Sequence, residues 1–569
     1  MDYRTTSRRK FILSVGVAIP GVSTLLAACS SSAPGAAPTQ AAPAAAPTAA
    51  PAAAAAPTTA PAVAPTAASA AAGAQGGTAV VSVASSPASW DLTSSTWPTW
   101  QGVHYLYDTL LTTDENEQLQ PGLATQWAAS DDAMTYTLTL RQNVMFHDGT
   151  PFNVDAVRFN FERHQQKQDS AYYQTFKMVQ SVEATDDHTA KISLSEPRPD
   201  FLYDLSFWGS LQLSPTATKA QGAQNQGVGT GPFKFSAYEQ DSHIDVTRFD
   251  GYWGGAPPLD GVRVRIIPES AVEVTEMQAK SIDIAQSLDP KDVDAVKKAG
   301  ATVENHTTPG AQFVSMNVTQ APTSELAVRK AIARAIDRDT IMQKVLFGLP
   351  EKALSGTPKN SPYYSADVPG VDYNPQEAGN ILDQAGWTMG PNGIRQRDGQ
   401  PLSLHILSSD FSGWGTYNQI FQDQLKAIGI DSQITTEEWN TYLDNWRENR
   451  EGWNLTYHSQ GSSFNSTTPI DASWAPSAFW NICQIGKASD PDTKKISDQL
   501  EAINQEFLKT SDVARRKELA KQAQTIYADQ QLVAWLWFSP SLIGVQARVK
   551  SYDLREHGRV IGLSKAYLG

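Results

Sequence analysis

The segment LQPGLATQWAASDDAMTYTLTLRQNVMFHDGTPF, residues 119–152, carries the local signals on which the fold prediction depends. Within it, apolar residues alternate with threonines over 134–140, a pattern typical of a half-buried strand. Gly149 stands in an Asp-Gly-Thr-Pro run, which predicts a turn. We therefore interpret His147 and Asp148 as turn residues and not as an acid/base pair.

Strand and helix patterns alternate along the rest of the chain. Alternation of apolar and polar residues predicts a strand at 262–266, and a continuous apolar run predicts a buried one at 532–538. Helical periodicity with capping residues predicts helices at about 325–336, 337–346, 417–428, 492–508 and 512–529. Mixed order of this kind over nearly 500 residues indicates layered α/β lobes.

Further motifs follow the opening segment in a fixed order. They are GTGPF at 229–233, YWGG at 252–255, VRKA at 328–331 and AIDR at 335–338. Together with residues 119–152 they resemble family 5 of the extracytoplasmic solute-binding proteins, the group that includes peptide- and nickel-binding receptors of ABC importers. The resemblance extends over residues 78–569.

This resemblance implies a two-lobe, periplasmic-binding-protein-like α/β fold of the class II type, with mixed sheets, a hinge and an extra subdomain inserted in the first lobe. The strand predicted at 532–538 fits this expectation, because a buried strand needs a sheet to join. The expected parts are lobe I at 78–115, 227–312 and 535–569, the inserted subdomain at 116–226, and lobe II at 313–534.

The resemblance also implies a function: the substrate-binding component of an ABC importer, which closes its lobes on a solute and delivers it to the permease. We expect a monomer without catalytic activity, cofactor or metal. No Gly-x-Ser-x-Gly elbow is present and none of the nine histidines forms an HExxH motif, which disfavours a secreted hydrolase. A binding component that feeds a sensor is the other alternative.

The N-terminus has the features of an export signal. Residues 7–13 (SRRKFIL) resemble a twin-arginine motif, and Leu26-Ala27-Ala28-Cys29 resembles a bacterial lipobox. We therefore expect a signal peptide at 1–28 and lipidation of Cys29. The uncharged Ala/Pro-rich stretch up to residue 77 then forms a tether that holds the protein at the outer face of the cytoplasmic membrane.

Charge and cysteine content exclude other classes. Lys and Arg number 45 against 59 Asp and Glu, so the formal net charge is −14, which disfavours a nucleic-acid partner. With Cys29 committed to the lipid, Cys483 has no partner in the chain, and no structural disulfide is expected.

Loops that follow strands are expected to supply the ligand contacts. From lobe I these are Ser94, Ser95, Trp97 and Trp100, and from lobe II they are Ser408, Ser409, Asp410, Trp414, Gln460 and Asn465. Indole rings, hydroxyls and amides dominate this set.

The charged anchors of peptide-binding relatives are missing from the matching positions. Such relatives hold the peptide amino group with an aspartate in a Trp-x-Asp segment, and dipeptide-binding members add an arginine. Here residues 458–465 read HSQGSSFN with no acid before Asp471, and serines 408 and 409 stand near the arginine position. The expected ligand is therefore a neutral polar solute, either an oligosaccharide or a peptide held by its backbone.

Overall fold

The computed structural model describes most of the chain from residue 76 onward. The described residues are 76–87, 90, 92–94, 103–114, 118–168, 170, 172–221, 227–359, 361–410, 413–449, 452–460, 475–477, 481–555 and 560–569. The predicted signal peptide, Cys29 and the tether lie outside them. Within these ranges, no helix combines the length and the apolar character that crossing a membrane requires.

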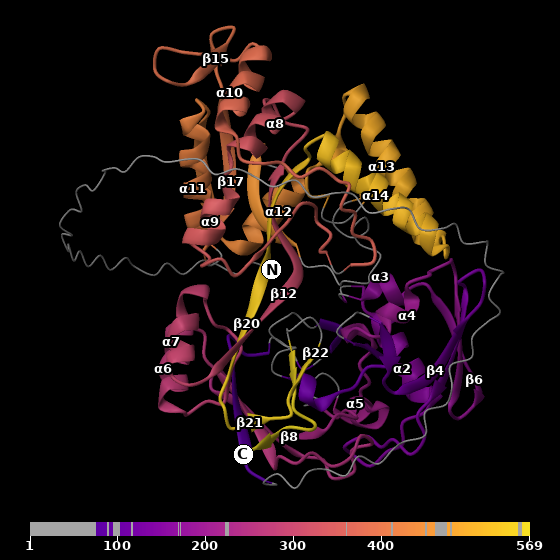
Figure 1. The fold of residues 1–569 in the computed structure, drawn as a ribbon. Helices are drawn as coiled ribbons and strands as arrows, with labels where there is room; N and C mark the ends of the chain where they lie inside the picture. Colours follow the sequence, from indigo (N-terminus) through magenta and orange to yellow (C-terminus); the bar gives the residue numbers. More distant parts are fainter. Residues whose placement is uncertain are drawn as a thin grey trace, which may run out of the picture. The chain divides into compact units, whose positions relative to one another are not determined.

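An eleven-stranded sheet is the framework of the described residues (Figure 1). Its two central strands, β12 (Thr302–Met316) and β20 (Val533–Val545), pair antiparallel over most of their length. On one side of this pair follow β19 (Leu455–Gln460), β17 (Ser403–Ser409) and β18 (Asp431–Glu437). On the other side follow β11 (Ile284–Ala285), β1 (Thr78–Val83), β10 (Gly261–Ile266), β9 (His243–Arg248) and β8 (Phe233–Glu239), while β13 (Glu351–Lys352) pairs with β20.

Buried apolar residues form separate cores around the two halves of the sheet, which lie at opposite ends of the strand order. The largest core is built from residues between Ala311 and Phe538, and we call the part around it lobe II. Lobe I is the part around two other cores, one on β1 and β8–β10 and one under α6 (Ser270–Ala279) and α7 (Val293–Lys298). Strand β20 contributes Phe538 to lobe II and Ile543 to lobe I, so it connects two separately packed halves.

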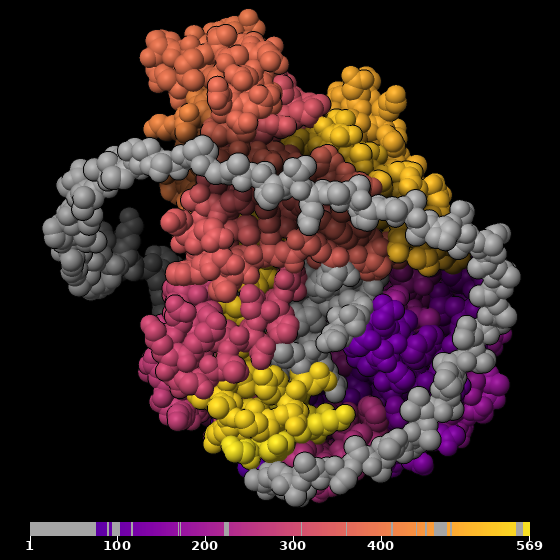
Figure 2. Space-filling view, viewed as in Figure 1, coloured from indigo at the N-terminus to yellow at the C-terminus, as the bar shows by residue number. Residues whose placement is uncertain are grey.

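The last residues of the chain return to lobe I. Val549, Leu563 and Ala566 are buried in the same core as the strands β8–β10. Figure 2 shows the surface of the C-terminal segment, in yellow, next to the magenta surface of lobe I.

A fourth core is formed by residues between Leu110 and Leu205, and we call this part of the chain the insert. It contains a four-stranded antiparallel sheet and α2 (Val154–Gln166), whose N-cap Asn153 accepts a hydrogen bond from the amide of Ala156. The strands in spatial order are β4 (Ala124–Ala129), β5 (Thr135–Leu140), β7 (Thr189–Leu194) and β6 (Val179–Asp186).

The local sequence patterns predicted many of these elements correctly. The strand expected at 134–140 is β5, whose apolar residues are buried, and the strand expected at 262–266 is β10. The five predicted helices are α8 (Leu326–Ala335), α9 (Arg338–Lys344), α11 (Trp414–Ala427), α13 (Pro491–Lys509) and α14 (Val513–Asp529). The strand expected at 532–538 is longer, because β20 continues into lobe I as far as Val545.

Asp108, two residues before the insert, is bound to lobe I and explains two of the sequence motifs. Its carboxylate accepts hydrogen bonds from Thr230 Oγ1 at 3.0 Å, Tyr252 OH at 3.2 Å and Trp253 Nε1 at 2.9 Å. His147 adds a second link, because its Nε2 lies 3.0 Å from the carbonyl of Gly231. The motifs at 229–233 and 252–255 are therefore structural joints.

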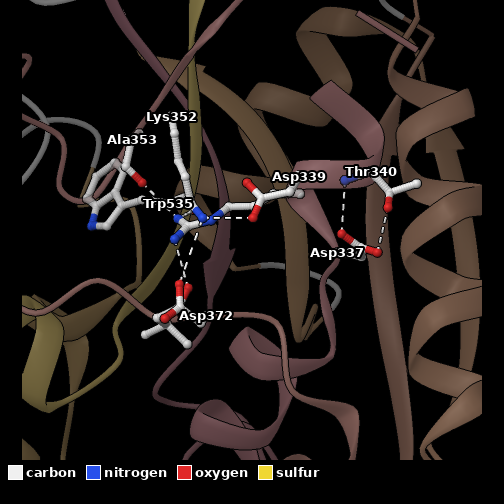
Figure 3. A network of polar contacts seen from close by, with 9 residues as sticks. Asp337, Asp339, Thr340, Lys352, Ala353, Asp372 and Trp535 are labelled. Carbon is white, nitrogen blue, oxygen red and sulfur yellow. Dashed lines mark hydrogen bonds and ion pairs between the residues drawn. The ribbon is translucent and has the colours of Figure 1, made fainter. Parts of the chain in front are cut away.

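Two motif arginines fix the interior of lobe II. Buried Arg338 donates to the carbonyls of Ala353, Trp535 and Val371, each at 2.7 Å. Figure 3 shows Ala353 and Trp535, two of the residues whose carbonyls this arginine binds, and Lys352 paired with Asp339 at 2.8 Å. Arg329 holds three more carbonyls in the same way, so both arginines supply donors to backbone oxygens inside lobe II.

Candidate ligand-binding site

The parallel strands of the two lobes end facing one another. In lobe II, β17 runs parallel to β18 and β19, and in lobe I, β1 runs parallel to β10 and β11. Strand β19 is antiparallel to β12, β11 is antiparallel to β20, and β12 and β20 are antiparallel to each other. It follows that β11 and β19 run toward each other. Open α/β sheets bind ligands outside the carboxyl ends of their parallel strands, so the candidate site lies between these two sets of ends.

The pairing register gives the separation of the two sets along β12. Strand β11 ends at the level of Val303, because Ala285 and Val303 both pair with Gly544. Strand β19 ends opposite Ala311. The intervening strand spans at most about 26 Å at roughly 3.3 Å per residue, which is enough for a short peptide or a sugar chain.

The central strand pair is irregular in this interval. Thr307 pairs with Pro540 and Ala311 with Phe538, so that three residues of β12 stand opposite one residue of β20. Pro309 and Pro540 both lack an amide hydrogen, which removes further ladder bonds. A bulge disrupts the ladder locally and bends the strand that carries it.

Gln312 ties three strands together beside this bulge. Its Nε2 donates to Ser459 Oγ on β19 at 2.7 Å and to Ser539 Oγ on β20 at 2.9 Å. Its Oε1 accepts from Tyr457 OH at 2.7 Å. The whole amide is therefore used within the protein, and it fixes the side of the candidate site that lobe II provides.

The predicted residues at the end of β17 have different surroundings. Ser408 and Ser409 are buried, and Ser408 Oγ accepts a hydrogen bond from Asn418 Nδ2 at 2.8 Å. Asp410 is exposed, and its amide donates to the carbonyl of Glu437 at 2.9 Å. Of these three side chains, only that of Asp410 is open to solvent.

Trp414 begins α11 and is 4% exposed. Its ring contacts Trp439, Tyr442, Tyr457 and His458 at centroid distances of 5.2 to 5.7 Å. Burial lowers the pKa of His458 to about 3, so the imidazole in this aromatic group is neutral. The indole of Trp414 is thus used mainly for packing inside lobe II.

The remaining predicted contacts fall at the edge of the described chain or outside it. The backbone of Ser94 belongs to a short helix, Leu92–Ser94, and that of Gln460 ends β19. Nothing is described of their side chains. Ser95, Trp97, Trp100 and Asn465 lie outside the described residues.

Gln286 is a candidate contact that the sequence pattern did not reveal. It follows β11 directly and is 8% exposed, yet neither its Nε2 nor its Oε1 has a hydrogen-bond partner. An amide buried in this state is costly unless a further partner binds it. The only local signal was a strand of two residues, which is too short to recognise by periodicity.

A buried carboxylate supports the backbone at Gln286. Glu273 on α6 accepts hydrogen bonds from Ser82 Oγ at 2.6 Å and from the amide of Ser287 at 3.1 Å. Burial raises the pKa of Glu273 to about 7, because these hydrogen bonds only partly offset the loss of solvent.

A charge in lobe I acts on a side chain of lobe II. Burial raises the pKa of Tyr417 on α11, and the negative charge of Asp289, just after β11, adds to the effect. Asp289 itself pairs with Lys291 at 2.9 Å. Residues 286–289, 410 and 438, directly after strand ends, and Gln460, the last residue of β19, include acids and amides but neither arginine nor lysine.

Among the residues that the structure describes, no group of three His, Cys, Asp or Glu side chains is arranged to hold a metal ion.

The geometry is that of a two-lobe binding protein, and comparison with known proteins identifies the family. Residues 118–479 match the model of the bacterial extracellular solute-binding proteins, family 5, and the chain belongs to this family. Its members are extracytoplasmic binding proteins of transport systems and not enzymes.

Individual relatives are similar over most of their length. The chain is 26% identical over 488 residues to a dipeptide-binding protein of Escherichia coli K12, covering 77% of this chain and 84% of that protein. It is 29% identical over 439 residues to the glutathione-binding protein GsiB of Pectobacterium atrosepticum, covering 74% and 81%.

Solved structures confirm the predicted fold class. Brucella suis NikA in complex with Fe(III)-EDTA aligns with a TM-score of 0.78 at 24% identity, over 87% of this chain and 100% of that chain. Bacillus subtilis AppA in complex with a nonapeptide aligns with a TM-score of 0.70 at 21% identity, over 87% and 99%. The chain therefore has the two-lobe α/β fold of the periplasmic binding proteins.

Proposed function

We propose that this protein is the lipid-anchored substrate-binding component of an ABC importer, which captures a peptide or a similar polar solute between lobes I and II and delivers it to a permease. The observation that carries the proposal is the convergence of both sets of parallel strand ends on a bulged, two-strand connection. Closing about the bulge between Thr307 and Gln312 would enclose a solute at these ends. The proposed division of the chain remains lobe I at 78–115, 227–312 and 535–569, with the inserted subdomain at 116–226, and lobe II at 313–534.

The charge of the residues at the strand ends favours a ligand that is not recognised through a free carboxylate. A carboxylate ligand needs a cation, and the residues that follow the described strand ends supply amides and acids instead. Gln286 offers both donor and acceptor capacity, and a peptide group can satisfy both. We therefore favour a peptide held through its backbone, with a neutral oligosaccharide as the second candidate.

Solution scattering with defined solutes tests the proposal. Dipeptides, end-blocked tripeptides and neutral oligosaccharides should be titrated into protein that has been unfolded, dialysed and refolded to remove bound solute. A binding peptide should reduce the radius of gyration. At 100 times its Kd it should also stabilise the native state by about 2.7 kcal/mol, which raises the melting temperature. Binding without compaction, or chemical alteration of the solute, would contradict the proposal.

The anchor is part of the same proposal and rests on the lipobox-like sequence before Cys29. Two or more acyl chains give stable attachment, because a single chain binds a membrane only marginally. The uncharged tether after Cys29 would then let the folded part reach a permease in the same membrane.

A further inference from the structure

An ion pair connects the insert directly to lobe II. Asp200 precedes α4 (Phe201–Asp204), and its carboxylate accepts a hydrogen bond from Nη2 of Arg516, in the first turn of α14. The two residues are 316 positions apart, and their side chains are 5% and 2% exposed. Figure 1 shows α4 near the end of the helix pair α13 and α14, where α14 begins.

Each partner is fixed to a different core. Phe201, which follows Asp200, belongs to the core of the insert, and Leu519, one turn after Arg516, belongs to the core of lobe II. The insert is in turn joined to lobe I through His147, and Asp108, just before the insert, is bound to lobe I as well. If the lobes separate about the bulge, Asp200 and Arg516 must therefore separate as well.

Arg516 is held in place by lobe II alone. Its Nε donates to Tyr363 OH at 2.9 Å, and its Nη1 donates to the carbonyls of Phe507 and Thr510 at 3.0 and 3.2 Å. The guanidinium also lies over the ring of Phe507, 4.1 Å from its centroid. These contacts leave Nη2 for the carboxylate of the insert, so the arginine is pre-organised to receive it.

Asp200 has no competing role in its own helix. It occupies the N-cap position of α4, where an aspartate usually accepts a backbone hydrogen bond, but its side chain makes no such bond. The carboxylate is directed to Arg516 instead. The neighbouring ion pair between Arg198 and Asp204, at 3.2 Å, remains within the insert.

We infer that Asp200 and Arg516 form an interlobe ion pair that selects one closed arrangement of the two lobes, the one in which both buried charges meet. This inference rests on the proposed function, because it assumes that the lobes open and close. In an open form both groups would be in water. In any misaligned closed form at least one would be buried without its partner, which is strongly unfavourable.

The ion pair is a selector and not a large source of net stability. Burial raises the pKa of Asp200 to about 6 even though Arg516 and Arg198 act in the opposite direction. Desolvation of the carboxylate thus outweighs the attraction of the two guanidinium groups. Replacing both partners with apolar residues should accordingly be tolerated, whereas replacing one should not.

Spin labels report the separation of the insert and lobe II. Exposed Glu183 in the insert and exposed Lys495 in lobe II are changed to cysteine for labelling in a Cys29→Ala background, while Cys483 is fully buried and stays unlabelled. Distance distributions between the labels are measured for protein as purified from its native host and for protein freed of solute by unfolding, dialysis and refolding.

The variants form a double-mutant cycle across the pair. Asp200→Leu and Arg516→Met should each lower the ratio of the short-distance to the long-distance population by about tenfold or more, because each leaves one buried charge unpaired. The double variant should recover to within about threefold of the wild type, and this coupling is not expected of two merely structural residues. Asp187→Asn, which changes an exposed aspartate of the insert, is the control and should leave the ratio unchanged.

The outcomes separate the inference from the proposed function. Single variants with the wild-type distribution, or a double variant with the summed loss of both singles, would overturn the ion pair as a selector. If Arg516→Met fails to fold, the Asp200→Leu variant alone tests the inference, because the Asp200 side chain makes no cap hydrogen bond to α4 of the insert. A wild type with one identical distribution in both preparations would instead overturn the proposed opening and closing.

Discussion

Gln312 and Ser539 lie on the two strands that pass between the lobes, and Nε2 of Gln312 donates to Oγ of Ser539 at 2.9 Å. The same amide binds Tyr457 and Ser459 on the neighbouring strand of lobe II. One side chain therefore links three strands next to the bulge about which the lobes would open and close.

Gln312→Leu should destabilise lobe II, because the substitution leaves the hydroxyls of Tyr457, Ser459 and Ser539 without this partner. We expect a loss of about 1–3 kcal/mol in the free energy of unfolding, measured by urea denaturation. Gln433→Leu, which changes another glutamine of the same sheet at an exposed position, is the control. Equal stability of the two variants would show that the Gln312 hydrogen bonds contribute nothing.

Asp108→Ala should loosen the insert, since Thr230, Tyr252 and Trp253 lose their common acceptor. The expected loss is about 2–3 kcal/mol, visible as a lower melting temperature and as faster proteolysis within residues 118–205. Asp187→Ala changes an exposed aspartate of the insert and should stay within about 0.5 kcal/mol of the wild type. Proteolysis of Asp108→Ala at the wild-type rate would refute the assigned joint.

Trp414 and Gln286 should respond in opposite ways. Trp414→Ala empties a packed aromatic group and should cost about 3–5 kcal/mol of stability. Gln286→Leu removes an amide that has no partner in the protein, so stability should be unchanged or slightly higher, while peptide affinity should fall about two- to tenfold. Thermal unfolding and calorimetry on both variants check this, and a destabilised Gln286→Leu with full affinity would remove Gln286 from the site.

Glu273→Gln should change how stability depends on pH. Because the pKa of this buried acid is raised to about 7, its contribution to stability is complete below about pH 4.5 and is lost as the pH rises through 7. Glutamine does not titrate, and its amide can donate to Ser82 Oγ and accept from the Ser287 amide. The variant should thus gain stability relative to the wild type between pH 4.5 and 8, and a constant difference across this range would contradict the assignment.

His147 should give a slope of the opposite sign. Burial lowers its pKa to about 4, and the neutral ring donates to the Gly231 carbonyl and accepts from the Gly229 amide at 3.3 Å. The contribution of neutral His147 to stability is complete above about pH 6.5. It is lost as the pH falls toward 4, because the unfolded chain then binds more protons than the native state. His147→Gln keeps one donor and one acceptor, so denaturation curves of the variant should lack this loss; a variant with the wild-type slope would argue against it.

The elements that the sequence predicted are those with local causes. Asp337 and Asp512 cap α9 and α14 because their side chains accept amide hydrogen bonds two or three residues further on, and such spacing is visible in a sequence. The pairing of β12 with β20 has no such local cause. Its register depends on partners more than 200 residues apart, and β11, which completes it, has only two residues.

The candidate site was predicted less well for the same reason. The position of Ser408 and Ser409 at a strand end was readable, but β17 has a strand on either side and helices pack against it, so both serines are buried while Asp410 is exposed. Gln286 and the pair of Asp200 with Arg516 depend on contacts between distant segments, which no periodicity reveals. The predicted tryptophans 97 and 100 and Asn465 remain predictions.

The measurement that tests the central claim most directly is mass spectrometry of the protein freshly purified from its native host, first under native conditions and then after denaturation. We predict one organic solute per chain, of peptide or similar polar character, which is held in the native spectrum and released intact on unfolding. A chain that carries no solute, or that carries a metal chelate in its place, would contradict a receptor that closes on a peptide-like ligand.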